Sequence, residues 1–294
     1  MIDFRIDALT IVRILAFSSL FGLLLAIGLE TRFRAILNAL RQAHLEATLL
    51  ANFLLVPLYA AALTIFFEIH ETPARAMMLL AAAPFAPVVP LFVRMAGGNL
   101  ALAAGLTGLF PILAALMTPA ALWFGLWLTG DIADDRPSSL LILEVLMSSI
   151  TLPLALGIGL GEAWPRIAKQ IHKPIEWISE AVGVLSLAFL SNLEASHLRL
   201  PDTWTLLPSV CFYEGSFLIG LYLMKSTGAN RLVLAFGTGN RNIGLAILLA
   251  AIFDQGIDLL GDVLGQSLLM LGLGLIHVGI ARLYIAFRHK ITKS

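Results

Sequence analysis

Residues 237–246 read G-T-G-N-R-N-I-G-L-A, and they lie in the middle of an apolar stretch that runs from Leu232 to Phe253. An apolar stretch of about 20 residues predicts a helix that crosses a membrane. Gly237, Gly239 and the polar residues around them predict that this helix unwinds near its centre. Irregular backbone at membrane depth is tolerated only where it is buried in protein or lines a water-filled cavity, so the interruption indicates a functional site.

A second interrupted stretch runs from Ala76 to Val93 and contains Pro84, Pro87 and Pro90. Each proline inside a helix removes a backbone hydrogen bond and clashes with the preceding turn. We therefore predict a break near mid-membrane in this helix too. Two interrupted helices in corresponding positions of two halves are typical of the central site of a secondary transporter.

The composition of the whole chain agrees with a membrane location. The chain has 294 residues, of which 59% are hydrophobic and only 13% are charged, whereas soluble domains contain about 25% charged residues. This composition predicts an all-α integral membrane protein. A formal net charge of zero argues against a nucleic-acid partner, because phosphate binding needs a surplus of cations. The single cysteine, Cys211, can form no intrachain disulfide.

Apolar stretches separated by charged or turn-rich segments predict nine transmembrane helices in a single polytopic domain that covers residues 1–294. The predicted spans are approximately Leu9–Gly28, Ala47–Phe67, Ala76–Val93, Leu100–Thr129, Ser138–Gly161, Ile175–Leu193, Trp204–Met224, Leu232–Phe253 and Val263–Phe287. The two interrupted spans start on opposite sides of the membrane, which indicates an inverted repeat. We place the first repeat at about 9–129 and the second at about 138–287.

Lysine and arginine are enriched in cytoplasmic loops, and they alternate between the gaps of the predicted topology. One side holds Arg32, Arg34, Arg41, Arg94, Arg166, Lys169, Lys173, Lys225, Arg231, Arg282, Arg288, Lys290 and Lys293. The other side holds Arg5, Arg75, Arg136 and Arg199. This asymmetry predicts a multi-pass protein of the cell membrane, either an inner or a plasma membrane, with the amino terminus outside and the carboxyl terminus in the cytoplasm.

Ionisable residues inside membrane spans are candidates for function by default. Arg241 lies between Asn240 and Asn242 in the eighth span, and Glu214 is the acid at the most similar depth, in the seventh span. One interpretation is a buried structural ion pair between Arg241 and Glu214. The other interpretation places Arg241 at a substrate anion or at a coupling-ion position, with Glu214 as a proton carrier that frees Arg241 when protonated.

Three other polar residues lie inside predicted spans. His277 in the ninth span is either a hydrogen-bonded packing residue or the wall of a cavity. Asn52 in the second span and Thr107 in the fourth are expected to satisfy the backbone of neighbouring helices.

Several segments resemble the bile acid:sodium symporter family between about Phe17 and Phe287. They are R-M-A-G-G-N-L-A-L-A-A-G-L-T at 94–107, L-M-T-P at 116–119, N-R-N-I-G-L-A at 240–246 and the segment at 52–57. The resemblance implies a ten-helix inverted-repeat fold or its nine-helix form, divided into a core and a panel. It also implies transport of organic anions with sodium, and two broken helices that cross near mid-membrane and hold two sodium ions.

The resemblance fails at the sodium ligands. Where the family carries a Ser-Asn pair, a serine, a glutamate and a glutamine, this chain has Val89 and Pro90, Ala103, Gly237 and Arg241. Only Thr107 and Asn52 keep ligand-like side chains as residual sodium-site positions. A guanidinium in such a site repels a second cation, so we expect Arg241 to take the space and charge of the lost sodium.

These features favour a secondary carrier of a small or amphipathic organic anion that works by alternating access without sodium, with no cofactor and with proton coupling as an option. The resemblance nominates Asn242 and His277 as substrate contacts. Three alternatives stay open: a sodium-coupled symporter, an uncoupled efflux permease of the same fold, and a non-transporting sensor or scaffold. The chain contains no H-E-x-x-H, G-x-S-x-G or P-loop motif, so we do not expect an enzyme. The sequence leaves the oligomeric state open.

Overall fold

The computed structural model describes residues 8–42, 45–130, 138–193, 201, 203–223, 228–252 and 256–291, and every element in these ranges is helical. The elements are α1 (Ala8–Glu30), α2 (Phe33–Gln42), α3 (Leu45–Leu50), η1 (Ala51–Leu55), α4 (Val56–Phe66), α5 (Glu71–Ala82), α6 (Val89–Ala96), α7 (Leu100–Leu128), α8 (Ser139–Leu146), η2 (Met147–Thr151), α9 (Leu152–Ala163), α10 (Pro165–Leu193), α11 (Thr203–Leu218), η3 (Ile219–Leu223), α12 (Ala229–Gly239), α13 (Ile243–Ile252) and α14 (Gly256–Ile291). The all-α membrane class is confirmed.

Seven stretches of these helices are long and apolar enough to cross a membrane. They are Thr10–Glu30, Leu45–Phe66, Leu100–Leu128, Ser139–Ala163, Trp204–Tyr222, Ala229–Ile252 and Asp258–Ile285. They coincide with seven of the nine predicted spans, so the chain is a multi-pass membrane protein.

The other two predicted spans differ from simple membrane helices for separate reasons. The span Ala76–Val93 is divided between α5 and α6, each of which is too short to cross a membrane alone. The span Ile175–Leu193 forms the second part of α10, where Glu176 and Glu180 lower the hydropathy. The count of nine spans therefore stays a prediction.

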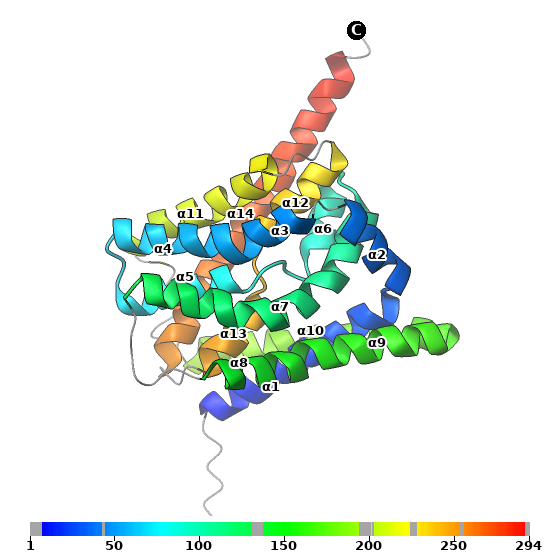
Figure 1. Ribbon diagram of the computed structural model, residues 1–294, viewed down its shortest axis with the longest axis horizontal. Helices are drawn as coiled ribbons and strands as arrows, with labels where there is room; N and C mark the ends of the chain where they lie inside the picture. The colour runs from blue at the N-terminus through cyan, green and yellow to red at the C-terminus, as the bar shows by residue number, and fades with distance from the viewer. Residues whose placement is uncertain are drawn as a thin grey trace, which may run out of the picture.

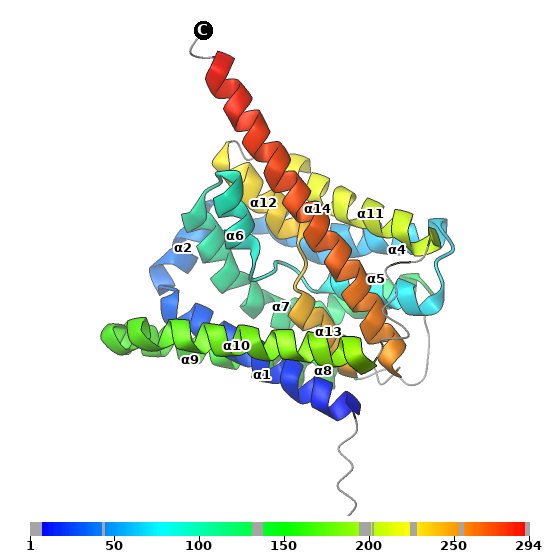
Figure 2. The same ribbon diagram turned by 180° about the vertical axis from the view of Figure 1, so that it is seen from behind.

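The helices are arranged as a side layer and a main bundle. The side layer consists of α1, the continuous helix α8–η2–α9, and α10, and it runs along the lower edge in Figures 1 and 2. Gly28 and Gly157 allow the backbones of α1 and α9 to touch, since a Cβ at Gly28 would lie 2.5 Å from the carbonyl oxygen of Leu154. The remaining helices form the main bundle. The two parts meet where α1 packs on α13, α8 on α7 and α10 on α14.

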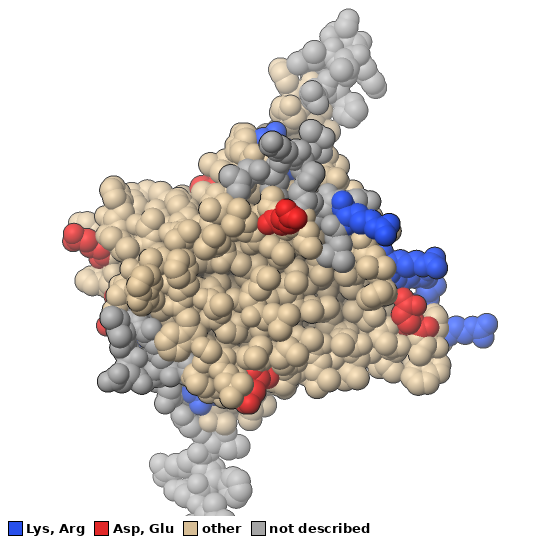
Figure 3. Space-filling view, viewed as in Figure 1, with Lys and Arg blue, Asp and Glu red and all other residues tan. Residues whose placement is uncertain are grey.

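The basic side chains gather at one end of the molecule. Figure 3 shows lysine and arginine concentrated at the end where α2 lies in Figure 1. This end includes Arg34 and Arg41 of α2 and Arg166 of α10, all exposed. Five of the cations used for the topology lie outside the described residues: Arg5, Arg136, Arg199, Lys225 and Lys293.

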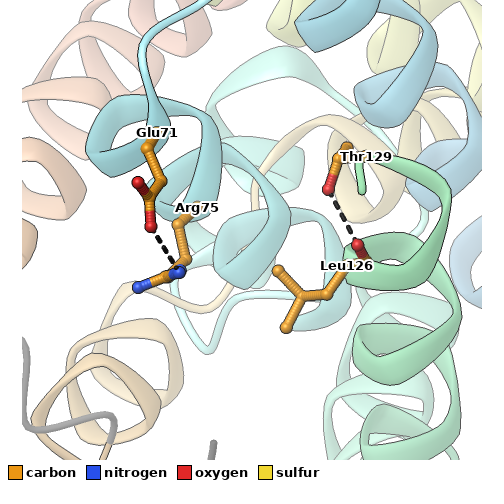
Figure 4. A network of polar contacts seen from close by, with 4 residues as sticks. All are labelled: Glu71, Arg75, Leu126 and Thr129. Carbon is orange, nitrogen blue, oxygen red and sulfur yellow. Dashed lines mark hydrogen bonds and ion pairs between the residues drawn. The ribbon is translucent and has the colours of Figure 1, made fainter. Parts of the chain in front are cut away.

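At the opposite end, α5 begins close to the point where α7 ends (Figure 4). The Nη2 atom of Arg75, a nearly buried side chain, lies 2.9 Å from Oε1 of the exposed Glu71, one turn earlier in α5. The hydroxyl of Thr129 donates to the carbonyl oxygen of Leu126 at 3.0 Å at the end of α7. These local contacts lie at the first turn of α5 and at the end of α7.

Candidate functional site at the crossing of two broken helices

The first break separates α5 from α6. The helix ends at Ala82 because Pro84 has no N–H group and forces the preceding residue out of the helical conformation. Ala83 accordingly has φ −105° and ψ 76°. Phe85 then has φ +56°, a left-handed conformation that is unusual for a bulky residue. The chain resumes as α6 at Val89, with Pro90 in its first turn. The helix is interrupted between Ala82 and Val89.

The second break separates α12, which ends at Gly239, from α13, which begins at Ile243. The two breaks lie side by side near the middle of the main bundle (Figure 1). Their backbones are paired: the N–H of Ala86 donates to the carbonyl of Asn240 at 3.0 Å, and the N–H of Asn242 donates to the carbonyl of Ala83 at 2.8 Å. The two broken helices therefore cross and are joined directly.

Arg241 lies at this crossing with 0% of its surface exposed. All five of its guanidinium N–H groups donate to oxygen atoms. Nε donates to Leu80 O (3.1 Å), Nη1 to Asn52 Oδ1 (2.7 Å) and Thr238 O (3.2 Å), and Nη2 to Asn52 O (3.2 Å) and Ala81 O. A guanidinium has five N–H donors, so its hydrogen-bonding capacity is fully used.

Two of these acceptors exist because the prolines end α5. In a continuous helix, residue 84 would donate to Leu80 and residue 85 to Ala81. Pro84 has no donor, and the left-handed turn at Phe85 directs the chain away, so the last carbonyls of α5 are available to Arg241.

A third acceptor comes from the π-helical turn η1. The N–H of Val56 donates to Ala51 rather than to Asn52. The next backbone position in this π pattern is Pro57, which cannot donate. The carbonyl of Asn52 is therefore left without a helical partner and accepts from Arg241. The side chain of Asn52 is oriented by Nδ2, which donates to Thr48 O at 3.0 Å and to the hydroxyl of Thr238 at 3.3 Å.

The charge of Arg241 is stabilised by helix ends rather than by an acid. The carboxyl-terminal ends of α5 and α12 both point their carbonyls at the guanidinium, and such ends carry a partial negative charge of about half an electron. None of the partners of Arg241 within the described residues is a carboxylate. The geometry is that of a cation held by neutral oxygen atoms.

Arg241 and Glu214 do not form the ion pair that one of the two interpretations of the sequence contained. Glu214 lies on α11 with its side chain 35% exposed, and its Oε2 atom lies 3.3 Å from Nε2 of His277 on α14. Depth along a helix does not determine which face a side chain occupies, and Glu214 is on the face of α11 that meets α14. The structure thus joins two predicted residues, Glu214 and His277, in a pair separate from Arg241.

The space beside Gly237 is filled by Phe85. A Cβ at Gly237 would overlap the ring of Phe85, which is 2% exposed and stacks on Phe110 with ring centroids 4.8 Å apart. Sequence reasoning missed Phe85, because a left-handed phenylalanine leaves no pattern in the sequence. Where the resemblance implies a glutamate, the structure has a glycine covered by an aromatic ring.

We predict that Gly237→Ala destabilises the protein by about 1–3 kcal/mol, the usual cost of overpacking a buried site. The stacked ring of Phe85 cannot move away without losing Phe110. Gly272→Ala on α14 is the matched control, since a Cβ there meets nothing within 4 Å. Thermal unfolding in detergent measures both. Adding Phe85→Leu to the Gly237→Ala variant should recover part of the lost stability. Equal stability of the Gly237→Ala and Gly272→Ala variants would contradict this packing.

The remaining predicted residues take separate positions. Thr107 is buried on α7, and its hydroxyl donates to Ala103 O of the same helix at 2.9 Å. Asn242 is nearly buried, and its Oδ1 accepts from the N–H of Leu245 at 3.1 Å, which caps the first turn of α13. Asn240 is fully buried, and its Oδ1 has no hydrogen-bond partner and faces Gly274 on α14. Of the two residual sodium-site positions, only Asn52 lies against Arg241.

Comparison with known protein families identifies the family of this chain. Residues 17–198, more than half of its length, match the family described as "Sodium Bile acid symporter family". The chain belongs to the sodium bile acid symporter family. The matched region includes Asn52, Phe85 and Thr107 and ends before Gly237 and Arg241.

A protein with a curated description is also similar to this chain. It is a "Sodium-dependent organic anion transporter" from Homo sapiens, and it is 23% identical to this chain over 230 residues. The aligned region covers 76% of this chain and 60% of the human protein. The chain therefore spans about 60% of the length of the curated relative that it matches.

The oxygen atoms at the crossing do not fit a sodium ion beside Arg241. Sodium prefers hard oxygen ligands, as other hard cations do. The side-chain and backbone oxygens of Asn52 are already hydrogen-bonded to the guanidinium, as are the carbonyls of Leu80 and Ala81. Gly237, where the resemblance implies a glutamate ligand, has no carboxylate and is covered by Phe85. This member of the sodium bile acid symporter family thus carries its own fixed cation at the crossing.

Proposed function

We propose that this chain is a secondary carrier of amphipathic organic anions that does not depend on sodium. The observation that carries the proposal is the complete hydrogen bonding of the buried Arg241 by oxygen atoms of three elements, η1, α5 and α12. A guanidinium in this position supplies permanently the positive charge that a bound sodium ion would supply transiently. Family membership supports transport, and the human relative supports an organic anion as the cargo.

The same proposal includes the topology. Nine spans would arise if α5–α6 crosses as one broken helix and α10 crosses alongside α1, with the inverted repeats at about 9–129 and 138–287. The side layer of α1, α8–α9 and α10 would act as the panel, and the main bundle with both breaks as the core. Alternating access then corresponds to movement of the core against the panel, as expected for carriers built from inverted repeats.

The orientation and the cargo follow from charge. The cation-rich end of the molecule faces the cytoplasm under the positive-inside rule, which leaves the amino terminus outside. An anionic head group is favoured near the crossing by Arg241, and an apolar body by the surrounding aliphatic and aromatic side chains. A carrier of this kind is a transporter and not an enzyme.

Uptake by proteoliposomes tests the proposal. Vesicles that contain the protein should accumulate a tritiated bile acid or a labelled steroid sulfate faster than empty vesicles, and an excess of the unlabelled anion should compete. A short aliphatic carboxylate serves as the comparison cargo without an amphipathic body. If no anion crosses although the folded protein binds one, the chain is a sensor or scaffold and the proposal fails.

A thermal-shift measurement tests the proposed substrate contact at Asn242. We predict that a bile acid raises the melting temperature of the wild type and does not do so in Asn242→Ala. Asn242→Ser is the matched control for helix capping, since serine also caps the first turn of a helix. Loss of the ligand effect in both variants indicates that the amide contacts the cargo. A full ligand effect in both would show that Asn242 only caps α13.

A further inference from the structure

The pair formed by Glu214 and His277 has an arrangement that requires a proton. Nδ1 of His277 lies 3.0 Å from the carbonyl oxygen of Leu273, one turn earlier in α14. A carbonyl oxygen only accepts hydrogen bonds, so Nδ1 must carry the ring hydrogen of a neutral imidazole. Nε2 would then present a lone pair to Oε2 of Glu214, 3.3 Å away. A carboxylate also presents lone pairs, and two acceptors do not attract each other.

One additional proton resolves this conflict. If the proton is on Nε2, the pair is imidazolium and carboxylate; if it is on Oε2, the pair is neutral imidazole and carboxylic acid. In both cases the pair has no net charge, and without the proton it carries one full negative charge. A net charge in the partly buried space between two helices is costly, so the observed geometry favours the protonated pair.

We propose that Glu214 and His277 together form the proton-binding site that couples this carrier to a proton gradient. This inference rests on the proposed carrier function and names its coupling ion. The step is balanced simply: one proton from water adds to the pair, and the charge of the pair changes from minus one to zero. The proton returns to water when the pair opens.

A cavity lined in part by His277 is the route to water that the proposal assigns to the pair. It has a volume of about 1230 Å³ and lies between the end of α11 with η3, the start of α12 and the second half of α14. Its walls include Leu221, Arg231, Ile280 and Tyr284, and His277 and Phe217 are also among the lining residues. Because α12 begins at the cation-rich side of the predicted topology, this route belongs to the cytoplasmic half of the membrane.

The pair is also connected to the crossing through the packing of one side chain, that of Phe217. The imidazole of His277 packs on the ring of Phe217, with centroids 4.1 Å apart. Phe217 in turn packs on Gly239, the last residue of α12, where a Cβ would lie 3.2 Å from that of Phe217. The chain of contacts is therefore His277, Phe217 and Gly239, and it ends two residues before Arg241. A rotation of the imidazole on losing its proton would press on the break that Arg241 holds.

The other titratable and charged groups around the pair do not offer the same chemistry. From α11 and η3 they are Cys211, Tyr213 and Tyr222, from α4 Tyr59, from α12 Arg231, and from α14 Arg282 and Tyr284. Arginine is always protonated, and tyrosine and cysteine ordinarily titrate above neutral pH. Among protein side chains, histidine is the one whose ordinary charge change falls between about pH 5 and 8.

The first test does not depend on transport. The geometry of the pair fits one bound proton, so removal of that proton at high pH should destabilise the folded state. We expect the melting temperature of the wild type in detergent to fall by about 5 °C between about pH 6 and 9.

The variant Glu214→Gln should remove this pH dependence. A glutamine amide donates directly to Nε2 of neutral His277 and imitates the protonated pair without a proton. Glu144→Gln is the matched control, because Glu144 is an exposed glutamate in the membrane helix α8, and it should keep the wild-type slope. An equal slope in Glu214→Gln and in the wild type would overturn the proposal.

The second test measures coupling in proteoliposomes with the membrane potential clamped. A pH gradient should change the initial rate of uptake of a tritiated bile acid by about fivefold or more in the wild type. In Glu214→Gln the initial rate should be independent of the pH gradient. If no anion is transported at all, the carrier function fails while the pH dependence of stability still reports on the pair. If transport occurs and a pH gradient has no effect on the wild type, the proton site is refuted and the carrier stands.

Discussion

Arg241→Met is expected to destabilise the protein by about 3–5 kcal/mol, on the order of 10 °C in melting temperature. Methionine has a similar reach but no donor, so it removes the guanidinium N–H partners of the buried oxygens of Asn52, Ala81 and Thr238, and Leu80 O keeps only the N–H of Ala83. Each unsatisfied buried polar group costs about 1–3 kcal/mol before relaxation. Thermal unfolding in detergent, followed by the intrinsic tryptophan fluorescence, measures the loss.

Two further variants identify the cause of that loss. Arg282→Met is the matched control, because the Nε of this exposed arginine donates a single hydrogen bond to Met95 O at 2.7 Å, and its removal should change the melting temperature little. Arg241→Lys keeps the charge but has three donors instead of five, so its stability should lie between the wild type and Arg241→Met. If Arg241→Met is as stable as Arg282→Met, Arg241 does not hold the crossing.

Arg241→Ala is expected to make the protein responsive to sodium. Truncation leaves a space surrounded by five oxygen atoms, two from Asn52 and one each from Leu80, Ala81 and Thr238. Hard cations bind such oxygen atoms well. A ligand at 100 times its dissociation constant stabilises the folded state by about 2.7 kcal/mol, so sodium should restore several degrees of melting temperature in this variant and none in the wild type.

The sodium response needs two comparisons. Choline chloride at the same ionic strength controls for salt, since choline is too large for the space. Low millimolar guanidinium should also stabilise Arg241→Ala, because it replaces the missing group itself. Stabilisation by guanidinium without stabilisation by sodium would show that the space recognises hydrogen-bond donors rather than a cation. An equal sodium effect in the wild type would contradict the proposal that Arg241 takes the place of a sodium ion.

The sequence predicted the features that depend on a residue's own chemistry. Pro84, Pro87 and Pro90 remove backbone donors, so the break before α6 follows from the sequence. Gly237 and Gly239 lie in the last turn of α12, directly before the second break. The position of Arg241 within an apolar stretch makes it a candidate functional residue. These features need no knowledge of neighbouring helices.

The partners of Arg241 were not predicted, because most of them are backbone carbonyls. Every residue has a backbone carbonyl, so the residue type does not show which carbonyl is free to accept a hydrogen bond from Arg241. That depends on a missing N–H donor several residues later. Pro57 and Pro84 were the two signals, since each lies where its absent N–H leaves a carbonyl free near Arg241. The pairing of Glu214 with His277 depends on the rotation of α11 and α14 about their axes, which depth along the chain does not reveal.

The most direct test of the central claim is the initial rate of bile acid uptake by wild-type proteoliposomes under equal inward gradients of sodium chloride or choline chloride, at one pH and one membrane potential. If Arg241 permanently replaces the sodium ion, the two rates are equal, because no sodium ion is needed to complete the crossing. Uptake that requires sodium and saturates with its concentration would contradict the account, since it would show a working sodium site in a chain whose crossing already holds a guanidinium.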